Sequence, residues 1–137
     1  MNYIASVSNS GIVRYMLYTQ SFDGLLYLCF LKRLVHASRR KLFVMVDRHP
    51  VHSRRLVQDW LAAHKDQIEV FYLPAYSPEL NPAEYLNNDV KQQVHDKPPT
   101  MSVAQLKRRT AAVLTRLQKL PARVSRYFRH PKIAYAA

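Results

Sequence analysis

The chain has 137 residues, of which 48% are apolar, and this is the size and composition of one ordinary domain with a hydrophobic core. Its formal net charge of +12 indicates a polyanionic partner, most economically nucleic acid. No apolar run is long enough to cross a bilayer and no signal-peptide pattern opens the chain, so we expect a soluble, cytoplasmic protein with no membrane partner. The single cysteine, Cys29, excludes an internal disulfide and is expected to be a buried apolar residue.

Apolar periodicity and turn residues predict alternating strands and helices. Strands joined through helices imply right-handed crossovers and parallel pairing, whereas an opening hairpin is antiparallel, so the sheet is expected to be mixed. In chain order, the pattern predicts a hairpin from residues 2–7 and 12–19, a helix over 21–37, a strand over 42–46, a helix over about 51–64, a strand over 68–73, and helices that start near residues 83 and 103.

Three of these elements carry more specific expectations. Asp23 stands where the first helix begins, and its expected role is to cap that helix. The strand over residues 42–46, Leu-Phe-Val-Met-Val, is expected to be buried on both faces. In the helix that follows, Trp60 belongs to an apolar stripe and is interpreted as a core anchor.

A stiff loop follows the strand that ends at Leu73. Its three prolines fix backbone angles and keep each preceding residue out of helical conformation. Pro82 follows a good N-cap residue, Asn81, and is expected at the first helical position, which places Glu84 in the first turn, where the helix dipole favours a carboxylate. For this loop taken alone, the default interpretation of Glu84 is an ordinary first-turn acid.

Asp47 is a second carboxylate at a strand end. Open α/β sheets bind ligands at the carboxyl ends of their strands, although an isolated Asp there is more often a turn cap. Two carboxylates at one sheet edge could hold a divalent cation, so we favour Mg²⁺ or Mn²⁺ bound by Asp47 and Glu84, with His49 or His52 near a substrate phosphate. A transition-metal site made of Asp47, His49 and His52 is the rival hypothesis, but its spacing supplies no fourth ligand.

These segments resemble the mariner-like bacterial insertion-sequence transposases, whose catalytic domain has an RNase H-like fold with an Asp-Asp-Glu triad. The resemblance rests on Val-Met-Val-Asp-Arg-His over residues 44–49 and on Leu-Pro-Ala-Tyr-Ser-Pro-Glu-Leu-Asn-Pro-Ala-Glu over residues 73–84. It implies that Asp47 is the second acid of the triad and Glu84 the third, with 36 residues between them, close to the spacing of the superfamily. Arg48 stands where the family usually has Asn.

The resemblance also implies an α/β fold, an RNase H-like mixed sheet flanked by helices, truncated before its first, central strand. The first acid of the family lies on that strand. We therefore expect one partial catalytic domain over residues 1–137, made of a hairpin (1–20), a core (21–95) and a basic helical C-terminal segment (96–137). A missing central strand would leave strand edges unpaired, so we expect either that another transposase chain or a second copy completes the sheet, or that the chain keeps a rearranged, less stable sheet.

Two functions follow as hypotheses. The first is DNA transposition: in the complete family domain, two divalent ions held by three carboxylates support the cutting and joining of phosphodiesters. The second is an inactive remnant that binds DNA non-specifically or modulates a full-length transposase. With two of the three acids, the Mg²⁺ or Mn²⁺ site of the isolated chain is expected to be weak or absent.

Basic side chains dominate the C-terminal third, and no acid follows Asp96. Non-specific, strongly salt-dependent phosphate contacts are therefore expected. Asn88 and Lys91 share a helix face with Glu84 in the predicted helix. The candidate DNA-binding residues are His49, His52, Asn88, Lys91, Lys107, Arg108, Arg109 and Arg116.

Overall fold

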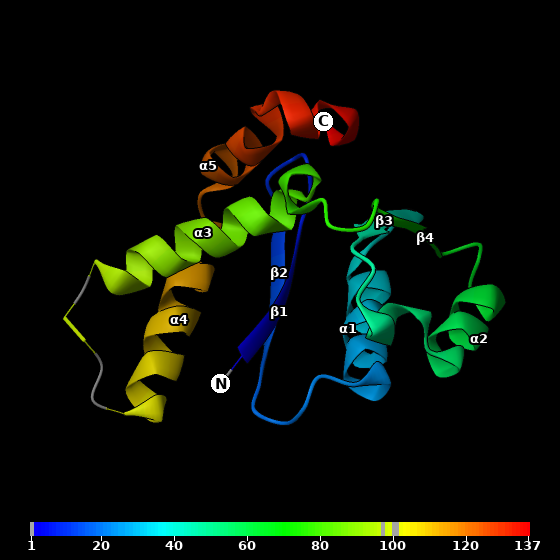
Figure 1. Ribbon diagram of the computed structural model, residues 1–137, viewed down its shortest axis with the longest axis horizontal. Helices are drawn as coiled ribbons and strands as arrows, with labels where there is room; N and C mark the ends of the chain where they lie inside the picture. The colour runs from blue at the N-terminus through cyan, green and yellow to red at the C-terminus, as the bar shows by residue number, and fades with distance from the viewer. Residues whose placement is uncertain (1, 97, 100–101) are drawn as a thin grey trace. The chain divides into compact units, whose positions relative to one another are not determined.

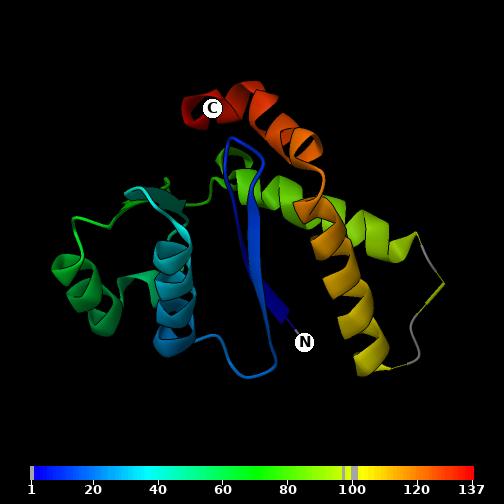
Figure 2. The same ribbon diagram turned by 180° about the vertical axis from the view of Figure 1, so that it is seen from behind.

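The computed structural model describes residues 2–96, 98–99 and 102–137 (Figures 1 and 2). The predicted order of elements is confirmed, with short 3₁₀ turns added. The strands and helices are β1 (Asn2–Val7), β2 (Val13–Tyr18), α1 (Gly24–Ala37), β3 (Leu42–Val46), α2 (Arg55–Ala63), β4 (Ile68–Tyr72), α3 (Pro82–His95), α4 (Val103–Gln118) and α5 (Pro121–Ser125).

Residue contacts divide the chain into two compact units. The first contains Met1–Thr19 and Pro82–Ala137, and the second contains Gln20–Asn81. This division differs from the three segments expected along the sequence, and the single partial domain stays a prediction.

In the first unit, β1 and β2 form the expected antiparallel hairpin, in which Asn2 pairs with Tyr18 and Val7 with Val13. Helices α3 and α4 pack against this hairpin and against each other. The turn of the hairpin lies beside the C-terminal helices in both views (Figures 1 and 2). Gly11 is required in that turn, since its φ is +90° and a Cβ there would lie 2.1 Å from the Pro121 carbonyl oxygen.

The core of the first unit comes from both ends of the sequence. Helix α3 contributes Leu86 and Val90, which are 0% and 3% exposed. Burial of such side chains stabilises the unit by about 1.5–3 kcal/mol each. The buried cluster consists of Val13, Leu86, Val90, Val113, Leu114, Leu117 and Val124.

In the second unit, β3 and β4 pair in parallel, with Leu42 opposite Ile68 and Val46 opposite Tyr72. Helix α2 connects them, as parallel pairing requires. Asp23 caps α1, because its carboxylate accepts a hydrogen bond from the Leu26 N–H at 2.8 Å, as expected. Helix α1 packs against α2 and against the 3₁₀ turn Pro50–Ser53.

Both pairings of a mixed sheet are present, and they occur in two separate two-stranded sheets. In the described part of the chain, no strand is hydrogen-bonded to both pairs, so the two pairs do not form a single sheet. Among the described helices, none is both long and apolar enough to cross a membrane.

Three expectations about burial and boundaries are wrong. The side chains of β3 alternate, and Phe43 is 60% exposed, because one face of a two-stranded sheet remains uncovered. Cys29 is exposed, since it lies on the face of α1 opposite to the buried residues Tyr27 and Leu31. The helix expected from residue 51 begins at Arg55, after a 3₁₀ turn that starts at Pro50. Trp60 on that helix is half-buried and stacks on His64.

Candidate functional site

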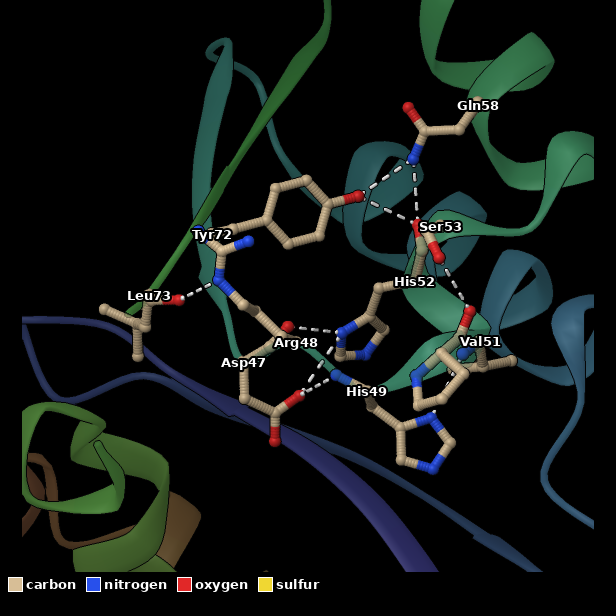
Figure 3. Close-up of polar contacts among 10 residues, drawn as sticks. Asp47, Arg48, His49, Val51, His52, Ser53, Gln58, Tyr72 and Leu73 are labelled. Atoms are coloured by element: carbon tan, nitrogen blue, oxygen red, sulfur yellow. Dashed lines mark hydrogen bonds and ion pairs between the residues drawn. The ribbon is translucent and has the colours of Figure 1, made fainter. Parts of the chain in front are cut away.

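Asp47 follows β3 at its carboxyl end and belongs to the second unit. One carboxylate oxygen, Oδ1, accepts a hydrogen bond from the His49 N–H at 3.2 Å and lies 3.3 Å from His52 Nδ1. The other oxygen, Oδ2, has no contact with the residues drawn in Figure 3, and the side chain is 58% exposed. Asp47 therefore caps the following turn through Oδ1, while its side chain remains mostly exposed.

His52 lies behind Asp47 in the interior of the second unit. It is 9% exposed, and its Nδ1 is 2.8 Å from the Asp47 carbonyl oxygen. Its ring packs on Tyr27, with the ring centres 4.5 Å apart. Burial lowers the pKa of His52, and the hydrogen bond and charge of Asp47 offset only part of that effect. The ring is therefore neutral near pH 7.

His49 is exposed beside this pair. Its Nδ1 accepts a hydrogen bond from the Val51 N–H at 3.1 Å, and its ring meets Phe22 edge to face at 5.5 Å. The two histidines therefore have different settings: His49 lies at the surface, and His52 is covered.

Arg48 connects the ends of the two parallel strands. Its Nε donates a hydrogen bond to the Leu73 carbonyl at 3.1 Å (Figure 3). The Leu73 N–H donates to the Val46 carbonyl at 2.8 Å. These bonds anchor the start of the proline-containing loop. Within that loop, Tyr76 is fully exposed and has a φ of +55°, an unfavourable value for a bulky residue. No periodicity or spacing in the sequence signals this residue.

Glu84 belongs to the first unit and lies in the first turn of α3, as expected. It is half-buried near Tyr3; burial and the charge of Glu84 together raise the pKa of the Tyr3 hydroxyl to about 12. Asn88 and Lys91 are exposed on the same helix. Glu84 and Asp47 lie in different units.

A buried ionic network centred on Asp89 of α3 was not predicted from the sequence. The Asp89 side chain is 10% exposed and accepts hydrogen bonds from Arg123 Nε at 2.9 Å and Arg123 Nη2 at 2.6 Å. Tyr127 and Gln93 donate to the same carboxylate at 2.5 and 2.9 Å. Burial would raise the pKa of Asp89, but the bonds from Arg123, Tyr127 and Gln93 outweigh it and lower the pKa to about 2. The available signal was the position of Asp89 beside the apolar residue Val90.

The basic candidates on α4 have two kinds of setting. Lys107 and Arg108 are exposed. Arg109 donates to the Val94 carbonyl at 3.4 Å, and Arg116 donates to the Gln93 side chain. Arg109 and Arg116 therefore use some of their hydrogen-bond donors in contacts with α3.

The donor chemistry of Asp47 fits a hard divalent cation. Mg²⁺ retains several waters and commonly takes only one or two protein carboxylates together with substrate phosphates. The outward-facing oxygen of Asp47 is a ligand of this type. In the described part of the chain no three His, Cys, Asp or Glu side chains are placed to hold a metal together, and this includes the rival set of Asp47, His49 and His52.

Comparisons with known proteins agree with this fold. The chain is similar to the crystal structure of the catalytic domain of Mos1 mariner transposase, with a TM-score of 0.65 and 17% sequence identity over 98% of this chain and 72% of that one. The expected RNase H-like α/β fold is thereby confirmed. A search of curated proteins found no match. The family model described as DDE superfamily endonuclease matches residues 1–107, so the chain belongs to the DDE superfamily endonucleases.

Proposed function

We propose that the chain is the part of a mariner-like transposase catalytic domain that carries the second and third metal-binding acids, Asp47 and Glu84. The family acts on DNA and generally uses divalent metal ions. The observation that carries the proposal is the setting of Asp47: it stands at a strand end, with one carboxylate oxygen held by the chain and a side chain that is 58% exposed.

The chain's own residues would position DNA and metal in the following way. Asp47 and Glu84 would each offer carboxylate oxygens, and Mg²⁺ or Mn²⁺, when bound, supplies charge neutralisation and activation of the attacking hydroxyl during in-line phosphodiester cleavage. Exposed Lys91, Lys107 and Arg108 would contact the DNA backbone. Contacts of this kind position DNA without selecting a sequence.

Nicking of supercoiled plasmid in Mg²⁺ or Mn²⁺ tests the proposal. We expect cleavage to be lost in both Asp47→Asn and Glu84→Gln. Matched controls are Asp59→Asn on α2 and Glu79→Gln in the proline-containing loop, since both residues are exposed acids outside the proposed metal set. Cleavage that survives in Asp47→Asn or Glu84→Gln would contradict the assigned roles.

A second candidate function is DNA binding without cutting. It is favoured by the lack of a three-ligand metal cluster in the described residues. Fluorescence anisotropy with labelled duplex DNA would then show tight, salt-sensitive binding while the plasmid remains intact. In this case the chain would act by occupying DNA or by pairing with a complete transposase.

A further inference from the structure

Two oxygen atoms of Asp47, one from the main chain and one from the side chain, lie close to Nδ1 of His52. His52 Nδ1 is 2.8 Å from the Asp47 carbonyl oxygen and 3.3 Å from the carboxylate oxygen Oδ1 (Figure 3). Both oxygens are hydrogen-bond acceptors, so Nδ1 of His52 carries a proton. One N–H thus meets both the main chain and the side chain of Asp47.

His52 is itself held from both sides. Its ring packs against Tyr27, which is 3% exposed. Its carbonyl oxygen accepts hydrogen bonds from Tyr72 Oη at 2.9 Å and from Gln58 Nε2 at 2.9 Å, and Gln58 also donates to Tyr72. Ring and backbone are therefore both fixed, and the Nδ1–H direction is set before any ligand arrives.

The carboxylate of Asp47 is oriented by these contacts. The His49 N–H and the His52 Nδ1–H approach the same oxygen, Oδ1. With Oδ1 engaged on the protein side, Oδ2 is the oxygen directed away from these contacts (Figure 3). A free Asp side chain would have to lose rotational freedom on binding a cation, whereas this side chain has already lost it.

We propose that His52 is a positioning residue that holds Asp47 in the orientation needed to bind a divalent cation through Oδ2. The inference rests on the proposed function, because it assumes that Asp47 is a metal ligand. Groups that orient a metal ligand in this way typically change metal affinity by about 10–100-fold when they are removed.

Binding of Mn²⁺ to the full chain, followed by the electron paramagnetic resonance signal of free Mn²⁺, tests the proposal. We expect His52→Leu to weaken Mn²⁺ binding by about 10–100-fold. His52→Asn should retain most of the affinity, since the amide nitrogen of Asn takes nearly the place of Nδ1 and can donate the same bond. His64→Leu is the matched control, because it removes a histidine of the same unit whose Nδ1 lies 2.7 Å from the Trp60 carbonyl oxygen instead of that of Asp47.

A second measurement needs no variant. Long-range ¹H–¹⁵N correlation spectra of the chain labelled with ¹⁵N-histidine distinguish the two neutral tautomers. We expect His52 to be protonated on Nδ1 without metal and after Mg²⁺ is added. Protonation on Nε2 would overturn the inference, whatever the variants do.

The outcomes separate the inference from the proposed function. If the wild-type chain binds no Mn²⁺, or if Asp47→Asn binds Mn²⁺ as the wild type does, the metal-binding role of Asp47 fails and the inference fails with it. If Asp47→Asn abolishes binding while His52→Leu binds as wild type does, only the inference fails. Weakened Mn²⁺ binding in His52→Leu, together with binding close to that of the wild type in His52→Asn, supports both the proposed function and the inference.

Discussion

Replacing Asp89 by Asn removes the centre of the buried ionic network in the first unit. The carboxylate accepts four hydrogen bonds, two of them from the Arg123 guanidinium. Asn offers a single acceptor oxygen, and its amide nitrogen would face the donors of Arg123. The variant therefore leaves buried donors without partners instead of deleting one isolated contact.

The size of the effect follows from the lowered pKa of Asp89. The folded value of about 2 lies below the ordinary value of 3.8, and this difference corresponds to about 2 kcal/mol of stability at neutral pH. Removing one partner of a fully buried ion pair costs about 3–5 kcal/mol, but the Arg123 side chain is 47% exposed, which reduces the cost. We expect Asp89→Asn to lower the free energy of unfolding by about 2–3 kcal/mol.

Urea unfolding followed by far-ultraviolet circular dichroism measures this loss at pH 7 and at lower pH. The pKa of Asp89 is lowered in the folded chain, so its contribution is complete above pH 3.8 and disappears as the pH falls through about 2. The difference between wild type and Asp89→Asn should therefore be constant between pH 5 and 7 and shrink below about pH 4.

Asp59→Asn is the matched control for this experiment. Asp59 pairs with Arg55 at 3.8 Å, and both side chains are mostly exposed, so the control should change stability by no more than about 0.5 kcal/mol. A loss in Asp89→Asn as small as in the control, or a difference between wild type and variant that does not change with pH, would refute the assignment of Asp89 as the buried anion of this unit.

Three further predictions concern other parts of the chain. Gly11→Ala should destabilise the first unit by at least about 1–3 kcal/mol in thermal unfolding, because the φ of +90° is strained for Ala and the new Cβ would meet Pro121; wild-type stability would contradict this. Tyr27→Phe should leave stability unchanged or raise it, since the Tyr27 hydroxyl is buried without a hydrogen-bond partner among the described residues; a clear loss in urea unfolding would reveal a missed partner. Replacing both Lys107 and Arg108 by Gln should make the slope of log affinity for DNA against log salt shallower by about 2, and an unchanged slope would mean that neither side chain contacts phosphate.

Local chemistry made much of the chain predictable from sequence. The hairpin, the helices and the parallel pair follow from periodicity and turn residues, and the Asp23 cap and the place of Glu84 in the first turn of α3 follow from capping rules. The family motifs around Asp47 and Glu84 likewise depend on residue types at short spacing. These features depend on residues within a few positions of one another, so they can be predicted from the sequence alone.

Tertiary structure decided the features that depend on what covers a side chain. Phe43 belongs to a run that reads as a buried strand, and it is exposed because the sheet has only two strands and one open face. Asp89 lies beside the apolar stripe of α3 and is satisfied by Arg123, a residue 34 positions away. His52 reads as a surface DNA contact, and it lies behind Asp47 because Tyr27, Tyr72 and Gln58 come together around it. Burial and hydrogen-bond partners are properties of the folded neighbourhood, and in each of these cases that neighbourhood is brought together by residues distant along the chain.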